Sequence, residues 1–322
     1  MKITVQAMGT VDLSELVAFT YYARKPEFEA KGIGVRQVEE SLREQIDGKS
    51  TVFIIARTET KLIGWMVLLP VSQTKLQINL DYLIDGRPVI DPAYSQHVLE
   101  KQLIQMARVW AGENDYQEII GKLMFHGRAL AEDKSENYES LGFRPEFVYV
   151  GMECDLMDFE SPDIVIPEEI SIGELEQASE RDLRALFFEA FRCGDTAFFR
   201  DLTDAEIDDY FDSLGYQDAL EQKGSIILRG EAGRLLGFSM VLAFEETTRH
   251  ISCMCIHPEF QGKGLGKLML QVMMQKIIAD GIEKLTLGTE QAMRAYQLYA
   301  SYGFRVTWGE VMYSLTGGKY KS

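Results

Sequence analysis

The sequence contains only four histidines and four cysteines among its 322 residues. A metal site would need more such ligands at suitable spacing, and Cys154, Cys193, Cys253 and Cys255 lie in apolar stretches typical of strands or helices. Cys253 and Cys255 alternate along an expected strand and therefore point to one face. We expect buried free thiols, no metal, and a reducing compartment, the cytoplasm.

Long apolar runs and positive charge are also scarce. No stretch approaches 18 uninterrupted apolar residues, so we expect no helix that spans a membrane. The first residues, MKITVQAMGTVDLSELV, lack the apolar core and cleavage site of a secretory signal. With 33 Lys and Arg against 50 Asp and Glu, the formal net charge is -17. This balance argues against nucleic acid or an anionic membrane as the main partner.

The length suits two domains, and three stretches recur in the same order, which predicts a tandem duplication. The pairs are KLIGWMVLL (61–69) with RLLGFSMVL (234–242), IDPAYSQHVLEKQLIQM (90–106) with IHPEFQGKGLGKLMLQV (256–272), and YESLGFR (138–144) with YASYGFR (299–305). Between the copies, DLMDFESPDIVIPEE (155–169) is acidic, contains two prolines and has no helical period. It is typical of a linker.

Each copy shows the pattern of a mixed α/β domain. The expected order is a strand, two helices, a two-strand hairpin, a strand, a helix, a strand, a helix and closing strands. In the second copy the patterns predict helices near 177–192, 203–214, 264–280 and 290–302, and strands near 168–173, 224–230, 234–244, 249–257, 283–288 and 305–315.

The stretch IHPEFQGKGLGKLMLQVMM (256–274) places glycines and lysines at the start of a long apolar helix. The first backbone amides of a helix have no partner within it, and the helix dipole adds positive charge there. Gly262, Gly264 and Gly266 let an anion approach the backbone, while Lys263 and Lys267 attract it. The spacing fits neither a P-loop nor a dinucleotide fingerprint. The pattern favours a phosphate or pyrophosphate site over a plain surface turn.

Two motifs in the second copy resemble the GCN5-related N-acetyltransferase (GNAT) family. They are Gln261-x-x-Gly264-x-Gly266 after IHPEF, and AYQLYASYGF (295–304). The resemblance implies two tandem GNAT acyl-CoA N-acyltransferase folds and acetyl-CoA as the co-substrate. It implies that the pyrophosphate lies on the turn and the pantetheine arm on the preceding strand. The residues so implied are Met254, Cys255, Ile256, Gln261, Gly262, Lys263, Gly264, Leu265, Gly266 and Lys267.

The same resemblance suggests catalytic roles. Tyr299 occupies the position of the family's general acid, and a backbone amide near Met254 to Ile256 is the implied donor to the oxyanion. Two positions depart from the family pattern: Leu287 replaces a glutamate found in acetyltransferases of ribosomal-protein N-termini, and Ala292 replaces an asparagine that contacts coenzyme A. The general base is therefore left open among Glu245, Glu246, His250 and Glu290.

The stretch 195–222 carries nine acidic residues and one basic residue, and in the family this region overhangs the acceptor. It can form an electronegative mouth for a cationic amine, or simply a solvated helix face. Four aromatic residues are interleaved with the acids, and they can hold an ammonium group or serve as core anchors. They are Phe198, Phe199, Tyr210 and Phe211.

The first copy lacks the features of the turn. Ser95, Val98 and Glu100 align with Gln261, Gly264 and Gly266, so bulk and negative charge replace glycine, although Tyr138 aligns with Tyr299. We therefore expect a degenerate, non-catalytic GNAT-like domain over 1–154 and a catalytic, acetyl-CoA-binding domain over 170–322.

The combined expectation is an N-acetyltransferase that modifies a primary amine of a small molecule or peptide. A tandem member of the family modifies an aminoglycoside-like thiol precursor, but no motif here favours such an acceptor over other amines. Two alternatives stay open: a non-catalytic acyl-CoA sensor or scaffold, and transfer to oxygen rather than nitrogen.

Overall fold

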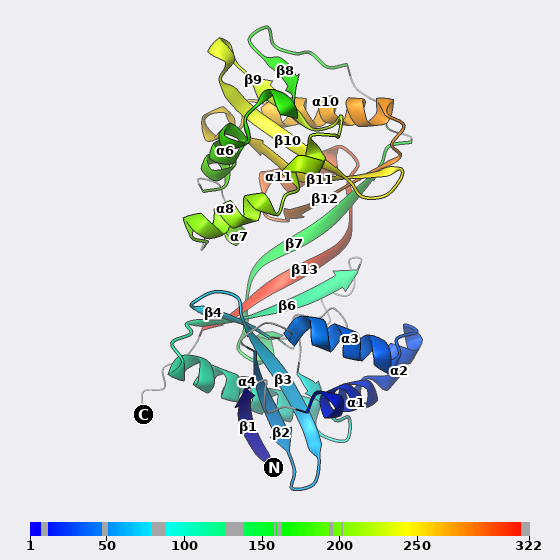
Figure 1. Ribbon diagram of the computed structural model, residues 1–322, viewed down its shortest axis with the longest axis vertical. Coiled ribbons are helices and arrows are strands. Elements are labelled where there is room, and N and C mark those ends of the chain that lie inside the picture. Colours follow the sequence, from blue (N-terminus) through cyan, green and yellow to red (C-terminus); the bar gives the residue numbers. More distant parts are fainter. Residues whose placement is uncertain are drawn as a thin grey trace. The chain divides into compact units, whose positions relative to one another are not determined.

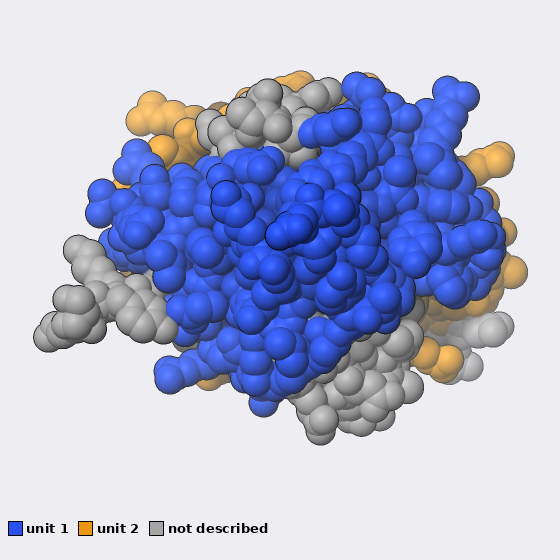
Figure 2. All heavy atoms as spheres, turned by 90° about the horizontal axis from the view of Figure 1, so that it is seen from below, with its two compact units in different colours: residues 1–146, 310–322 blue, residues 147–309 orange. Residues whose placement is uncertain are grey.

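The protein is represented by a computed structural model that describes residues 1–7, 12–46, 51–78, 88–126, 138–157, 159, 163–192, 196–200 and 202–316. The chain divides into two compact units, residues 1–146 with 310–322, and residues 147–309. Figure 2 shows these units in blue and orange. Each unit contains a sheet with helices packed on it, which confirms the predicted α/β class with its mixed sheet (Figure 1).

The first unit is built on strands in the order β1-β2-β3-β4-β6-β13, with β5 paired to β3. Its elements are β1 (Lys2–Ala7), α1 (Leu13–Ala23), α2 (Lys25–Ala30), α3 (Val35–Ile46), β2 (Val52–Arg57), β3 (Leu62–Pro70), β4 (Lys75–Ile78), β5 (Val89–Ile90), α4 (Gln96–Glu113) and β6 (Glu118–His126). Helices α1 to α3 share one apolar core with β2 and β3. Helix α4 packs on β1, β2 and β3 but contributes no side chain to that core, so it covers the other face.

The sequence predicts two helices after the first strand of each copy, and this prediction is wrong: the described residues form three there in the first unit and four in the second. Pro26 lies in the first turn of α2, where the lack of an amide hydrogen costs nothing. In the middle of one continuous helix, Pro26 would lack the amide that bonds to the carbonyl of Tyr22, and its ring would clash with that carbonyl. Helix α1 therefore ends at Ala23 and α2 begins at Lys25.

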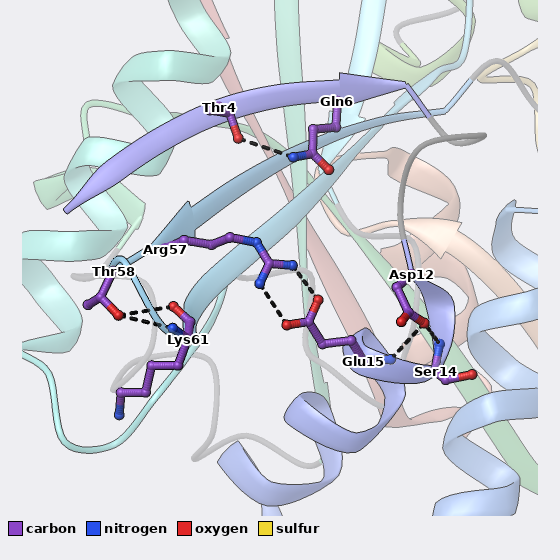
Figure 3. Close-up of polar contacts among 8 residues, drawn as sticks. All are labelled: Thr4, Gln6, Asp12, Ser14, Glu15, Arg57, Thr58 and Lys61. Atoms are coloured by element: carbon purple, nitrogen blue, oxygen red, sulfur yellow. Dashed lines mark hydrogen bonds and ion pairs between the residues drawn. The ribbon is translucent and has the colours of Figure 1, made fainter.

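Short-range polar contacts fix α1 against the sheet (Figure 3). The side chain of Asp12 accepts hydrogen bonds from the amides of Ser14 and Glu15 and so caps the helix. Glu15 in turn forms a bidentate ion pair with Arg57 at the end of β2. Paired in this way, the guanidinium of Arg57 lowers the pKa of Glu15 through hydrogen bonding, against the effect of burial.

Trp65 on β3 is fully buried, and its indole Nε1 donates a hydrogen bond of 3.1 Å to Thr20 Oγ1 on α1. Thr20→Val keeps the shape of the side chain but leaves this buried donor without a partner. We expect the variant to lose about 1–3 kcal/mol of unfolding free energy, measured by urea denaturation. Thr4→Val on the edge strand serves as the control. An unchanged urea midpoint for Thr20→Val would contradict the assigned bond.

The second unit has strands in the order β7-β12-β11-β10-β9-β8. Its elements are β7 (Arg144–Asp155), β8 (Ser171–Glu174), α6 (Glu180–Arg192), α7 (Ala197–Arg200), α8 (Asp204–Asp212), α9 (Tyr216–Ala219), β9 (Ile226–Arg229), β10 (Leu235–Ala243), β11 (Thr248–Ile256), α10 (Leu265–Ala279), β12 (Lys284–Glu290) and α11 (Arg294–Ser301), with 3-10 turns at Leu175–Gln177, Glu231–Gly233 and Pro258–Phe260. Helices α6, α7 and α8 share a core with one face of the sheet, and α10 packs on the other face of the same strands.

The two units exchange their final strands. Strand β7 closes the first repeat in sequence, yet its residues from Phe147 onward belong to the second unit and pair with β12. Strand β13 (Arg305–Thr316) closes the second repeat, yet its residues from Glu310 onward belong to the first unit. The compact units therefore differ from the repeat borders expected at 154 and 170, although the alignment of the repeats is unaffected.

The stretch expected to be a linker, 155–169, starts inside β7, and residues 158 and 160–162 lie outside the described part of the chain. Its described remainder is not free of contacts. Leu156 is buried and its amide donates a 2.7 Å hydrogen bond to Glu283 O, and Phe159 stacks on Tyr302. This segment therefore packs onto the second unit before it leads into β8.

None of the described helices is both long and apolar enough to cross a bilayer. Cys154, Cys253 and Cys255 are buried and free, whereas Cys193 lies outside the described residues. Burial raises the pKa of the Cys154 thiol to about 11, so it stays protonated at neutral pH.

Candidate functional site

Strands β11 and β12 pair and then separate. Their parallel pairing covers residues 248–251 and 284–287, and ends at Ile251 and Leu287. Beyond that point β11 continues along β10, while β12 continues along β7. One edge of residues 252–256 therefore faces a gap in which its backbone groups have no partner among the described strands. An extended ligand can hydrogen-bond to such an open edge, as an added strand does.

The gap leads to the glycine-rich turn and to the start of α10. Gly262 and Gly264 have φ of 73° and 86°, a left-handed conformation that glycine adopts without steric cost. Within the described residues, the backbone amides of 262–267 donate no hydrogen bond to another part of the chain. Amides without a partner at the positive end of a 15-residue helix are able to bind an anion.

The side chains of the turn support the same conclusion. Lys263 Nζ lies 4.8 Å above the centre of the Phe260 ring, and Lys267 is exposed on the first turn of α10. Within the part of the chain that the structure describes, neither lysine forms an ion pair, so both charges are available to a ligand. Gln261 donates from Nε2 to Ile256 O over 3.0 Å and so ties the turn to the end of β11.

Tyr299 lies on α11, buried with 6% of its surface exposed. Burial raises its pKa, and the thiols of Cys253 and Cys255 and the phenol of Tyr149 add to the effect. The phenol therefore carries its proton throughout the neutral range, as a general acid must. Its hydroxyl donates no hydrogen bond to the described residues, which leaves the proton available.

The equivalent positions of the first repeat are used differently. Ser95 precedes α4 without capping it, Val98 is 55% exposed, and the carboxylate of Glu100 is buried beneath the first turns of the helix. Tyr138 is buried, stacks on Tyr313 at 4.8 Å, and donates from its hydroxyl to Lys122 O. The tyrosine thus serves the packing of the first unit.

The predicted base candidates lie at different places. Glu245 is exposed in the turn between β10 and β11, next to the paired end of β11. Six residues of strand separate Thr248 from Met254, or about 20 Å, so this placement does not favour Glu245. Glu290 lies at the gap but is buried, and both of its oxygens accept backbone amides.

His250 is closer to the gap and half-buried. Its Nδ1 lies 3.0 Å from Thr286 Oγ1, and burial lowers its pKa, so the imidazole is neutral at neutral pH. Of these candidates, His250 alone is both near the gap and in a form that can accept a proton at neutral pH. Glu246 is exposed in the same turn as Glu245.

Four acids of the stretch 195–222 pair with arginines of α6 or cap their own helix. Arg184 forms ion pairs with Asp208 and Asp212, and Arg192 pairs with Asp204. Glu206 completes a capping box with Thr203. Asp195 and Asp201 lie outside the described residues. These contacts match the solvated-helix interpretation better than an open acidic mouth.

Three of the four interleaved aromatics are core anchors. Phe199 and Phe211 are buried in the cluster between α6 and the sheet, and Tyr210 packs against it. Phe198 differs, because 38% of its surface is exposed. Ala292, at the position where the family carries an asparagine, is exposed in the turn before α11, and its methyl group offers no hydrogen bond to a ligand.

Three features escaped the sequence patterns: the single-turn helices α7 and α9, and the link between α7 and Glu290. A turn of four residues gives no measurable period, and the contact spans more than 90 residues of sequence. Among the described residues, no group of three or more His, Cys, Asp or Glu side chains is arranged to hold a metal ion.

Comparisons with known proteins agree with this geometry. Residues 182–304 match the acetyltransferase (GNAT) family. A mycothiol acetyltransferase of Propionibacterium freudenreichii is 30% identical over 102 residues, which cover 30% of this chain and only 33% of the relative. The match thus spans a third of that relative's length.

Two solved structures cover almost the whole chain. A GCN5-related N-acetyltransferase from Sphaerobacter thermophilus superposes with a TM-score of 0.57 at 16% identity, over 98% of this chain and 95% of its own. A tandem GNAT protein from the clavulanic acid biosynthesis pathway gives 0.54 at 13% identity, over 99% and 100%. At these identities the likeness concerns the fold, which is repeated twice along the chain.

Proposed function

We propose that the chain is a tandem GNAT protein whose second unit transfers the acetyl group of acetyl-CoA to a primary amine of a small molecule or peptide. The match of residues 182–304 to the GNAT family and the fold shared with the two solved structures support this proposal. One observation carries the proposal: the free amides of residues 262–267 follow directly on the open edge of β11. The first feature fits a pyrophosphate and the second fits a pantetheine arm, in the order in which coenzyme A presents them.

In this proposal the turn from Gln261 to Lys267 binds the pyrophosphate through Gly262, Lys263, Gly264, Leu265 and Gly266. Backbone groups of Met254, Cys255 and Ile256 hold the pantetheine arm along the gap. Ala292 and Tyr299 lie beside the thioester end. In this proposal a backbone amide among Met254 to Ile256 donates to the carbonyl oxygen as negative charge develops on it.

The reaction then requires two proton movements. The neutral amine attacks the thioester carbonyl, the C–N bond forms, and the C–S bond breaks. Tyr299 gives its proton to the departing thiolate, and the amine loses its proton through water to His250. Glu245 and Glu290 are assigned no proton transfer, because one lies far along the hairpin and the other is occupied by backbone amides.

The first unit is proposed to be non-catalytic. Its counterpart to the turn carries Val98 and a buried Glu100, and its counterpart to the acid, Tyr138, is bonded to a backbone carbonyl. An acceptor like that of the mycothiol acetyltransferase is one specific form of the proposal, and no residue described here selects it over other amines.

The proposal is tested by incubating the full chain with acetyl-CoA and a panel of primary amines, and by following release of the free thiol. We expect release that depends on at least one amine. Tight binding of acetyl-CoA with no release for any amine or alcohol would instead favour the alternative, an acyl-CoA sensor. Release only with alcohols would replace transfer to nitrogen by transfer to oxygen.

A further inference from the structure

Glu290 links the end of β12 to helix α7. Its side chain is 4% exposed, and its two carboxylate oxygens accept hydrogen bonds from the amides of Ala197, over 2.9 Å, and Phe198, over 2.7 Å. Charge-assisted bonds of this kind are about twice as strong as neutral ones. A carboxylate that is buried and doubly bonded in this way fixes the segment that it holds.

The two hydrogen bonds of Glu290 fix the backbone at Phe198, an exposed aromatic residue of α7. The ring of Phe198 rests edge-on against Phe199 at 5.0 Å and tilts against Tyr210 at 5.4 Å, so its inner side is backed by the core. Its outer side is open. Because Glu290 lies where β12 borders the gap, Phe198 is held beside that gap.

The neighbouring hydroxyl is also unusual. Thr196 is 4% exposed, and its Oγ1 has no hydrogen-bond partner within the described residues. A buried hydroxyl without a partner costs free energy unless a ligand or water supplies one. The segment 196–198 thus offers an exposed ring and an unsatisfied hydroxyl at the same border of the gap.

The charges nearby do not favour a polycation. Asp204, Asp208 and Asp212 are paired with arginines, and the carboxylate of Glu290 is committed to amides. The exposed side chain of the segment 196–198 is the aromatic ring of Phe198, which suits the carbon body of an acceptor.

From these contacts we infer that Phe198 is a specificity-determining wall of the acceptor pocket, and that Glu290 is the positioning residue that holds it in place. The acceptors selected are primary amines with an aromatic or bulky apolar body next to the amino group. This inference rests on the proposed function and goes beyond it by naming the acceptor class and the residues that select it.

The test uses 2-phenylethylamine as the apolar acceptor and ethanolamine as the small polar one. Phe198→Ala should weaken binding of 2-phenylethylamine to the protein saturated with coenzyme A by about tenfold in calorimetry, and raise its KM alike. The KM values for ethanolamine and acetyl-CoA should change less than about twofold. Tyr22→Ala, which removes an exposed ring from α1 of the first unit, should change neither acceptor.

Glu290→Gln replaces one acceptor oxygen by an amide that faces a backbone donor, so it should loosen the segment. We expect the same selective loss for 2-phenylethylamine, with faster hydrogen exchange at Ala197 and Phe198. The double variant Phe198→Ala with Glu290→Gln should lose no more than the larger single effect, because Glu290 acts through Phe198.

The other outcomes distinguish failure of this inference from failure of the proposed function. A fall in kcat for both amines in Glu290→Gln, with Phe198→Ala silent, would overturn the inference and make Glu290 a proton acceptor. Turnover that ignores both substitutions would overturn it as well. Amine binding that depends on Phe198 without any turnover would overturn the proposed function, but it would support the role of Phe198 in selecting the amine. Absence of both binding and turnover would overturn both.

Discussion

Gly264→Glu is expected to weaken acetyl-CoA binding by about a hundredfold or more in Kd, measured by calorimetry on the full chain. The substitution places a carboxylate in front of the free amides of residues 262–267, where the negative pyrophosphate is proposed to lie. A side chain at this position meets no protein atom within 4 Å, so the loss would come from charge and from the ligand's space.

Two controls separate this effect from damage to the fold. Gly281→Glu also puts a side chain on a glycine of positive φ with no atom within 4 Å, but at the other end of α10. It carries a similar backbone cost, about 1–2 kcal/mol, and should retain binding. Val98→Glu, at the aligned position of the first repeat, should also bind normally. Equal loss from Gly264→Glu and Val98→Glu would show that the assignment of the binding unit is wrong.

Tyr299→Phe is expected to lower kcat by about a hundredfold, with less than a twofold change in the Kd of acetyl-CoA. The variant keeps the buried ring and its packing against Phe304, so only the proton donor is lost. Because burial raises the pKa of Tyr299, the wild-type phenol remains an acid across the neutral range.

Tyr138→Phe in the first repeat is the matched control for this experiment. It removes a hydroxyl that donates to Lys122 O, so it should cost stability but leave kcat unchanged. If Tyr299→Phe retained full turnover, thiolate release would need no proton from this residue, and the tyrosine would leave the mechanism.

The longer elements of the second unit were predictable because they follow from local patterns. The period of the apolar residues predicts α10, and the glycines before it predict its start; the structure begins that helix at Leu265. The hairpin of β10 and β11 follows from two apolar runs on either side of a polar turn. These features depend on neighbours within one turn or one strand.

The features that escaped prediction depend on distant partners. An isolated glutamate after a strand is usually exposed, and only the fold brings Glu290 to the amides of Ala197 and Phe198. Similarly, the sequence predicts closing strands for the first copy but does not say which sheet receives them. The sequence shows that α8 is acidic. It does not show that Arg184 and Arg192, which lie 12 to 28 residues away, pair with these acids.

The exchange of β7 and β13 between the two units has a consequence for how such a chain could arise. A gene for one repeat alone would encode a domain whose last strand does not pair within it, while the edge meant to receive a strand stays bare. Two copies of that ancestor could satisfy each other by swapping these strands, which is an inexpensive route to a homodimer. Fusing the two genes would then have joined the copies permanently, so that their pairing no longer depended on concentration. One copy could then lose residues needed for activity and still supply the strand that the other copy requires.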